Sequence, residues 1–359
     1  MKKNTLFITG GAGFIGSNFI QHLFASPGFA GRVVNYDNLT YAGNEDNLAA
    51  IREKWQEQRY FFVKGDINDR KLVKDSLARF QPQAVVNFAA ESHVDRSIDA
   101  PMVFIDTNIR GTASLLEEAL AYWQSRAGSE KEKFRFLHIS TDEVFGALAD
   151  SGSFSEKTPY HPNSPYAASK AASDHLLNAW HQTFGLPVLL TNCSNNYGPY
   201  QFPEKLIPLM IINCLHEKPL PVYGHGANVR DWLYVDDHCG ALRRVLAEGR
   251  VGTSYNIGGG NELKNIDVVK SICAIMDGIR PRAGGKSYRD LIAFVSDRPG
   301  HDYRYAIDFS KIKNELGWKP GHNFDSGLRE TVQWYIDHAA WWQAIREKKY
   351  DLARLGIRK

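Results

Sequence analysis

Short β-branched runs alternate with helical patterns over about the first 195 residues of the chain. Strands that alternate with helices pair in parallel, because each crossover helix returns the chain to the same end of the sheet. The pattern therefore predicts an α/β fold, a doubly wound parallel sheet with helices on both faces. The strand candidates are TLFIT, RVVNYD, RYFFVKGD, AVVNFAA, FRFLHIST and PVLLTNC.

Beyond about residue 195 this rhythm loosens. The chain has prolines at positions 199, 203, 208, 219 and 221, then strand-like DWLYV and TSYNIGG, then a basic, loop-rich stretch from 280 to 305. We expect a smaller C-terminal lobe whose segments interleave with the first domain. The predicted division gives residues 1–195 and about 235–260 to the first domain, 196–234 and 261–342 to the second lobe, and 343–359 to a tail.

Two helical patterns stand out in the first domain. Apolar residues recur between Val103 and Leu120, and a second pattern runs from Tyr166 to Phe184. Each pattern has the spacing of one helix face and predicts one long helix. The same two helices could serve a subunit interface.

Composition excludes several classes of function. A chain of 359 residues with 43% hydrophobic content can bury a sizeable core, and its net charge of +3 comes from 43 basic and 40 acidic residues that are scattered throughout. This is no footprint of nucleic-acid or membrane binding, although a small anionic ligand stays open. Four distant cysteines without a C-x-x-C argue against zinc and disulfides, so we expect no metal site.

The N-terminal sequence MKKNTLFITGG has an apolar run far too short for a secretory signal, and no run of about 20 apolar residues occurs. The cytoplasm is the expected compartment.

A glycine-rich turn follows the first strand candidate. In TLFITGGAGFIGS, Gly10, Gly13 and Gly16 open a helix whose N-terminus can face an anion, and glycine lets backbone N–H groups approach a pyrophosphate. About 20 residues on, Asp37 ends RVVNYD, where it can accept hydrogen bonds from an adenosine ribose and repel a 2′-phosphate. The pattern favours NAD over NADP; for the glycines alone, a turn without a ligand is the alternative. Asp66 could lie beside the adenine or be a solvated turn acid.

The segment SPYAASKAASDHL places Tyr166 and Lys170 one helical turn apart. A free phenol has a pKa of about 10 and is a poor base near neutrality. We expect the ammonium, helped by the positive nicotinamide of NAD⁺, to lower the pKa of Tyr166 so that it can take a hydroxyl proton. Without the glycine motif, a solvated helix face would be the better interpretation.

Two adjacent acids, Asp142 and Glu143, follow the strand candidate FRFLHIST. Suppose that a hydride step creates a ketone at C4 of a hexose: the C5 proton then becomes acidic, and loss of the C6 hydroxyl needs a base at C5 and an acid at the C6 oxygen. Close carboxylates suit this task, because like charges raise one pKa and keep one member protonated. Hydride return to C6 completes a loss of water without net oxidation. The alternative is that the pair only caps or solvates a loop.

The combination of GGAGFIG, Asp37, STDE and YAASK resembles the extended short-chain dehydrogenase/reductase family of sugar-nucleotide-modifying enzymes. The resemblance implies a Rossmann-like domain that binds NAD, a smaller sugar-nucleotide-binding lobe, a homodimer, and a catalytic set in which Thr141 joins Tyr166 and Lys170. The implied cofactor contacts are Gly10, Gly13, Phe14, Ile15, Gly16, Asp37, Asn38, Leu39, Thr40, Asp66, Ile67, Phe88, Ala89, Ala90, Ser92, Thr107, Tyr166, Lys170 and Asn196.

Within this family, STDEVFG looks like the STDEVYG of the 4,6-dehydratases, in which Asp is the acid and Glu the base. Carried over, Asp142 protonates the C6 oxygen and Glu143 removes the C5 proton. The epimerases of the family lack this pair. Phe145 stands where the pattern has a tyrosine, so no phenol can donate a hydrogen bond there, but none of the steps above needs one.

Further stretches match the same dehydratases, so the resemblance spans roughly residues 5 to 335. We expect Arg230 and Arg298 to bind the pyrophosphate, because the guanidinium fork of arginine suits phosphate oxygens. Without the surrounding motif, each arginine would more often form a surface ion pair. His225 stands where these dehydratases usually have a lysine, so the resemblance implies no lysine-like cationic contact from that position. The implied substrate contacts are Ser92, Thr141, Asn195, Lys205, Leu206, Pro221, Tyr223, Arg230, Asn265, Arg298 and His301.

The resulting prediction is a lyase that dehydrates dTDP-glucose to its 4-keto-6-deoxy product in a deoxysugar pathway; thymidine is implied by resemblance alone. The alternatives are a sugar-nucleotide 4-epimerase, a 4,6-dehydratase acting on a UDP-, CDP- or GDP-sugar, and a non-catalytic binding protein on the same scaffold.

Overall fold

A seven-stranded sheet forms the centre of the computed structural model, which describes residues 4–297 and 300–348. All six neighbouring strand pairs are parallel, in the order β10-β6-β5-β4-β1-β2-β3. The predicted parallel sheet is confirmed. Its strands are β1 (Thr5–Thr9), β2 (Arg32–Asp37), β3 (Tyr60–Lys64), β4 (Ala84–Asn87), β5 (Arg135–Thr141), β6 (Val188–Cys193) and β10 (Thr253–Ile257).

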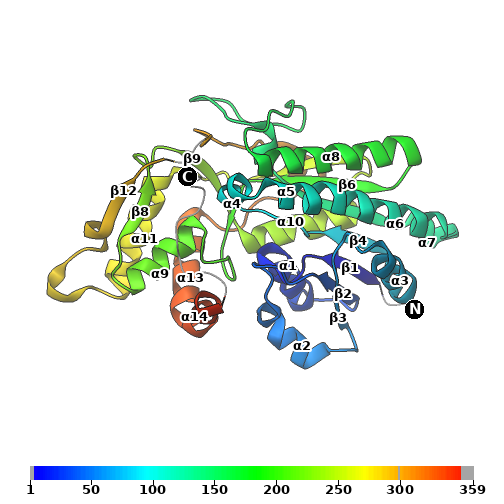
Figure 1. Ribbon diagram of the computed structural model, residues 1–359, viewed down its shortest axis with the longest axis horizontal. Coiled ribbons are helices and arrows are strands. Elements are labelled where there is room, and N and C mark those ends of the chain that lie inside the picture. The colour runs from blue at the N-terminus through cyan, green and yellow to red at the C-terminus, as the bar shows by residue number, and fades with distance from the viewer. Residues whose placement is uncertain (1–3, 298–299, 349–359) are drawn as a thin grey trace.

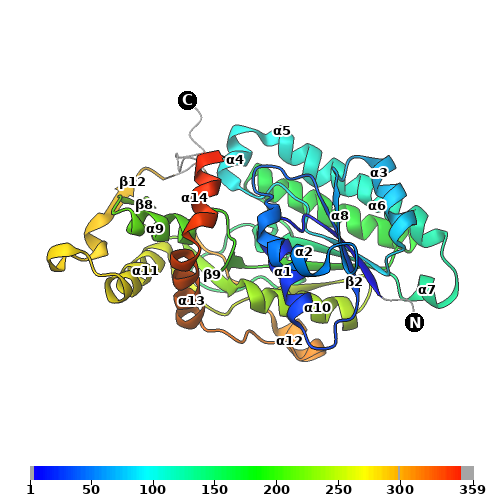
Figure 2. The same ribbon diagram turned by 90° about the horizontal axis from the view of Figure 1, so that it is seen from below.

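Helices cover both faces of this sheet, as Figures 1 and 2 show. On one face, apolar side chains of the sheet pack against α1 (Phe14–Ala25), α2 (Ala49–Trp55), α10 (Val235–Glu248) and α12 (Ser310–Leu316). On the other face they pack against α3 (Arg70–Phe80), α6 (Thr112–Gln124) and α8 (Pro165–Phe184). The strands are apolar over almost their whole length because both faces are covered.

The helical pattern between Val103 and Leu120 forms three consecutive pieces instead of one regular helix. They are α5 (Pro101–Phe104), the π-helical segment η2 (Ile105–Gly111) and α6. The wider π turn keeps Thr107 at a cavity wall while Asn108 is buried, where its Nδ2 donates to Glu91 O at 3.0 Å and to Ser169 Oγ at 2.8 Å. A π segment of this kind is frequent near functional sites.

The second lobe has its own apolar core between helices and two small sheets, at the left of Figure 1. One sheet has the order β11-β9-β7, and the other pairs β12 with β8. Its strands are β7 (Asn195–Tyr197), β8 (Leu220–Tyr223), β9 (Val229–Tyr234), β11 (Glu262–Lys264) and β12 (Ile292–Val295). Its helices are α9 (Leu206–Leu215), α11 (Asn265–Ile279), α13 (Phe324–Asp337) and α14 (Ala339–Lys348). The domain boundaries given above stay a prediction.

Short elements complete the chain and lie in its connections. They are α4 (Val94–Asp99), α7 (Gly128–Glu132), and the 3₁₀ turns η1 (Glu45–Leu48), η3 (Asp142–Phe145), η4 (Ala283–Gly285) and η5 (Tyr288–Leu291). None of the helices in the described part of the chain has the length and apolar character needed to cross a bilayer.

The sheet order changes direction between β1 and β4, because β2 and β3 lie on one side of β1 and β4 to β6 on the other. Connections leave the carboxyl ends of these two strands in opposite directions, which opens a crevice where ligands of doubly wound folds bind.

Candidate active site

A large cavity lies at the carboxyl ends of the parallel strands, where the sheet meets the second lobe. The expected catalytic residues Thr141, Asp142, Glu143, Tyr166 and Lys170 all line it. The other expected residues that line it are Gly10, Gly13, Phe14, Ile15, Gly16, Asp37, Asn38, Thr40, Asp66, Ile67, Phe88, Ala89, Ala90, Ser92, Thr107, Asn195, Asn196 and Lys205.

The glycine turn after β1 is closely packed at its base. Gly10 has φ +69, and a Cβ there would lie 2.6 Å from Ala89 N. A Cβ on Gly16 would lie 2.3 Å from Gly10 O, so both positions require glycine. Asp37 ties the turn to the end of β2, since its Oδ2 accepts from Ala12 N at 2.9 Å and its Oδ1 from Leu39 N at 2.8 Å. Leu39 itself does not appear in the cavity wall.

The acidic pair is held at the point where β5 becomes the turn η3. Thr141 Oγ1 accepts from Glu143 N and donates to Asp142 Oδ1, each at 3.3 Å. Asp142 Oδ2 is buried without a hydrogen-bond partner in the described protein. Phe145, at the end of the turn, stacks on Phe154 with ring centroids 5.1 Å apart. The residue that departs from the family pattern therefore packs in a small apolar cluster.

The surroundings of the pair favour different protonation states. Asp142 is 1% exposed, and burial raises its pKa well above the usual value, with further raising by the charges of Glu143 and Asp231. The guanidinium of Arg230 and the hydrogen bond from Thr141 oppose this only in part. Burial thus favours the protonated form of Asp142, while Glu143 keeps partial exposure at the cavity wall.

Tyr166 and Lys170 enter the cavity from the first two turns of α8. Ser164 caps this helix, because its Oγ accepts from Ala167 N at 3.1 Å, and Pro165 occupies the first helical position. Lys170 Nζ donates to Ile139 O at 2.8 Å. Both side chains are buried.

Apart from Lys205, the substrate contacts expected in the second lobe lie beyond this cavity wall. The set comprises Leu206, Pro221, Tyr223, Arg230, Asn265 and His301, and Arg298 falls outside the described residues. Arg230 donates to Asp302 O at 3.0 Å and lies over the Tyr305 ring at 4.2 Å. Tyr223 OH donates to Asp95 Oδ2 at 3.2 Å, and its ring meets that of His301 edge-on. Asn265 Oδ1 is buried without a hydrogen-bond partner in the described protein.

Comparison with known proteins places this site in a family. The GDP-mannose 4,6 dehydratase family profile matches residues 7–331. A dTDP-glucose 4,6-dehydratase of Xanthomonas campestris pv. campestris is 57% identical over 98% of this chain and 99% of its own length. The chain belongs to the dTDP-glucose 4,6-dehydratase family. Solved dehydratases of this name from Streptomyces venezuelae and Bacillus anthracis, both with NAD, are 46% and 44% identical with TM-scores of 0.86 and 0.84. Each alignment covers 95% of this chain and 99% of the other.

The cavity fits the NAD expected for a dTDP-glucose 4,6-dehydratase. The tight glycine turn leaves no room for Cβ atoms beside the start of α1, as a pyrophosphate site requires. Asp37 stands at the end of β2 with its carboxylate at the cavity wall, next to Asn38 and Asp66, whose side chains are joined by a 2.9 Å hydrogen bond. These residues would hold the adenosine half of the cofactor.

The protein groups alone do not give Tyr166 the lowered pKa that was expected with Lys170 and NAD⁺ together, and the effect of NAD⁺ stays a prediction. Burial raises the pKa of Tyr166 well above its usual value, and the charge of Glu143 raises it further. Lys170 does not offset this, because its Nζ turns to Ile139 O and His138 Nε2 rather than to the phenol. A hydrogen bond with Thr141 is the protein contact that lowers the pKa of Tyr166.

Sequence reasoning missed part of the cavity wall. Tyr41 and Glu204 both line it, and Arg96 joins them: its guanidinium lies 3.9 Å from the Tyr41 ring centroid and donates to Glu204 Oε2 at 2.9 Å. These residues come from three distant segments, so no local spacing could have connected them. The other missed wall residues are Tyr36, Ala42, Gly43, Gly65, Glu91, Ile139, Ser140, Cys193, Ser194, Tyr200, Gln201 and Phe202. No group of three or more metal-binding side chains occurs among the residues described.

Proposed function

We propose that this protein dehydrates dTDP-glucose to dTDP-4-keto-6-deoxyglucose, as its relatives' names indicate for them. The observation that carries the proposal is the acidic pair: a fully buried Asp142 beside a partly exposed Glu143, in one cavity with Thr141 and Tyr166. A 4-epimerase needs the tyrosine but has no step for two adjacent acids.

Bound NAD⁺ would accept a hydride from C4 of the glucose ring and return it to C6. Tyr166 takes the proton of the C4 hydroxyl, and Thr141 positions that hydroxyl. Lys170, held at the wall by Ile139 O, supplies a positive charge beside the reacting groups.

Elimination is the work of the acidic pair. The C4 ketone makes the C5 proton acidic, so Glu143 can remove it as an enolate forms. Asp142, kept protonated by burial, gives its proton to the leaving C6 hydroxyl. Glu143 then returns its proton to C5. The sugar loses one water without net oxidation.

We further propose that the second lobe binds the nucleoside diphosphate. Arg230 and Arg298 would pair with the pyrophosphate, and the free Oδ1 of Asn265 would accept a hydrogen bond. Tyr223 and Pro221 would offer apolar surface to the base ring, with Leu206 and His301 completing the site.

We infer that the protein forms a homodimer. Large apolar side chains are exposed on α5 and η2, at Met102 (61%), Val103 (48%) and Ile105 (42%). A grouped apolar surface of this kind is unusual on a monomer, and a second copy of the chain would cover it. We also infer a reducing compartment such as the cytoplasm, because all four cysteines are free thiols.

A panel of nucleotide-glucoses tests the proposed reaction. Purified protein is incubated with dTDP-, UDP-, CDP- and GDP-glucose, and each mixture is analysed by mass spectrometry. We expect dTDP-glucose to lose the mass of one water without consumption of added NAD. An isomer of equal mass would indicate an epimerase. Dehydration of GDP-glucose alone would indicate a GDP-sugar substrate, the class named in the matched family profile.

A further inference from the structure

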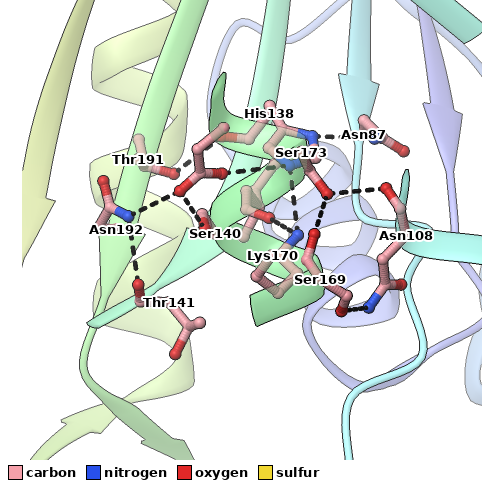
Figure 3. Close-up of polar contacts among 12 residues, drawn as sticks. Asn87, Asn108, His138, Ser140, Thr141, Ser169, Lys170, Ser173, Thr191 and Asn192 are labelled. Carbon is pink, nitrogen blue, oxygen red and sulfur yellow. Dashed lines mark hydrogen bonds and ion pairs between the residues drawn. The ribbon is translucent and has the colours of Figure 1, made fainter. Parts of the chain in front are cut away.

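Lys170 has an unusual environment for a cation. The side chain is 3% exposed, and its Nζ contacts Ile139 O at 2.8 Å and His138 Nε2 at 3.3 Å (Figure 3). No ion pair joins Lys170 directly to a carboxylate of the described residues. Burial lowers the pKa of Lys170, so an ammonium here needs a compensating charge.

A buried carboxylate with no part in the proposed chemistry stands one helical turn further along α8. Asp174 is 3% exposed and follows Lys170 by four residues, so both side chains leave the same helix face. Its Oδ2 accepts from Ser140 Oγ at 2.8 Å, from Tyr160 OH at 3.0 Å and from Asn192 Nδ2 at 3.3 Å. Three donors on one oxygen favour the ionised form.

The second oxygen of Asp174 has no hydrogen bond and faces His138. Asp174 Oδ1 lies 3.7 Å from His138 Nε2, the atom that also lies beside Lys170 Nζ. Asn87 holds the ring from behind, because its Nδ2 lies 2.9 Å from His138 Nδ1, so the other ring nitrogen, Nε2, faces Lys170 and the carboxylate.

We propose that Asp174 is a positioning residue for the reaction: from behind the His138 ring, its carboxylate keeps Lys170 protonated at the cavity wall. The proposal rests on the role given to Lys170 in the proposed function. His138 is the neutral spacer that holds the two charges on either side of its Nε2.

Other groups around Lys170 do not supply this charge. Burial raises the pKa of Cys193, on β6, to about 12, so the thiol is neutral near neutrality. Burial lowers the pKa of His138, on β5, so its ring is neutral as well. Tyr166, on the same helix, is a neutral phenol in the protein alone. Burial raises the pKa of Asp174 to about 6, which still leaves it ionised at neutral pH. Its charge is the group that raises the pKa of Lys170 most.

The direct test is a titration of Lys170 in protein labelled with ¹³C-lysine, without substrate. Its resonance is assigned by its loss in Lys170→Arg. Asp174→Asn removes the charge and keeps the shape: the amide oxygen can take the three donors, and the amide nitrogen replaces the oxygen that has no donor. We expect the pKa of Lys170 to fall by about 1–3 units in this variant. Asp174→Ser, which is neutral and smaller, must shift it in the same direction.

Ser173→Ala is the matched control. Ser173 is a fully buried neighbour on α8 whose hydroxyl bonds to Asn108 O and Ser169 O, away from Lys170. This variant should leave the pKa of Lys170 unchanged. An unchanged pKa in both Asp174 variants, or an equal fall in Ser173→Ala, overturns the proposal.

A kinetic readout separates the proposal from the proposed function. In Asp174→Asn the high-pH limb of the rate of NADH formation in single turnovers, the step beside Lys170, should move to lower pH while KM for dTDP-glucose stays close to that of the unchanged protein. A limb that stays in place overturns the proposal. If the unchanged protein does not dehydrate dTDP-glucose at all, the proposed function fails, but the Lys170 titration still decides the role of Asp174.

Discussion

Asp142 and Glu143 are neighbours in the sequence but lie in different surroundings. The first is buried with an unpaired Oδ2, and the second reaches the cavity wall from the next position of the turn η3. Burial therefore does more than mutual repulsion to separate their protonation states, since it is the leading cause of the raised pKa of Asp142. The sequence predicted the acid and base roles by repulsion and resemblance alone.

Replacing Glu143 by Gln should stop the reaction after oxidation. The amide cannot remove the C5 proton, whereas the groups that act at C4, Tyr166 and Thr141, are untouched. We expect an NADH absorbance signal in a stopped-flow experiment with dTDP-glucose, and product formation slower by about 10²–10⁴-fold. A variant that gives no NADH signal would show that Glu143 also serves the oxidation step.

The elimination step should depend on pH through Asp142. Its pKa is raised, and only the protonated form can give a proton to O6, so elimination should be fast below this pKa and slow as pH rises through it. The decay of the NADH signal in single turnovers measures this step. Asp142→Asn should be slow at every pH and lose the alkaline fall. A decay that becomes faster with rising pH would assign the acid to another group.

At the scale of elements, the joint between β1 and α1 is the most constrained part of the cofactor site. Gly16→Ala would place a methyl group 2.3 Å from Gly10 O, a contact that the turn can relieve only by opening. We expect NAD binding, measured by calorimetry, to weaken by at least about tenfold, because the turn no longer presents its N–H groups together.

Gly278→Ala is the control for this substitution. Gly278 lies in α11 with nothing within 4 Å of its Cβ position, so alanine should stabilise that helix by about 0.5–1 kcal/mol and leave NAD binding unchanged. Equal NAD affinity in both variants would remove the turn from the cofactor site.

Strands were easier to predict than the long helix. Each of the six strand candidates forms a strand, because a buried parallel strand is apolar along its length and is bounded by turns. Within the interruption at η2, Asn108 bonds to Glu91 and Ser169, one of them earlier and one later in the chain. A helical period carries no information about such distant partners.

At the scale of the whole molecule, the parallel sheet gathers a site from distant segments. Motifs with a fixed spacing, such as the glycine turn and Y-x-x-x-K, could be placed from the sequence because one local element holds them. The contact among Tyr41, Arg96 and Glu204 could not, because it exists only after the strand ends and the second lobe meet.

The proposed dimer can be tested on the exposed apolar surface. Ile105→Glu places a charge on η2 where a second copy is expected, and it should shift the protein from dimer to monomer in light scattering after size exclusion. Phe294→Glu changes a more exposed apolar side chain, on β12 in the other lobe, and should leave the dimer intact. A dimer that survives Ile105→Glu and dissociates with Phe294→Glu would place the interface on the second lobe.

The central claim is that one hydride leaves C4 and returns to C6 of the same sugar. The most direct measurement is to incubate the protein with dTDP-glucose deuterated at C4 and to locate the label in the product by NMR. We expect deuterium at C6 of dTDP-4-keto-6-deoxyglucose. Product whose C6 methyl group contains no deuterium would contradict it.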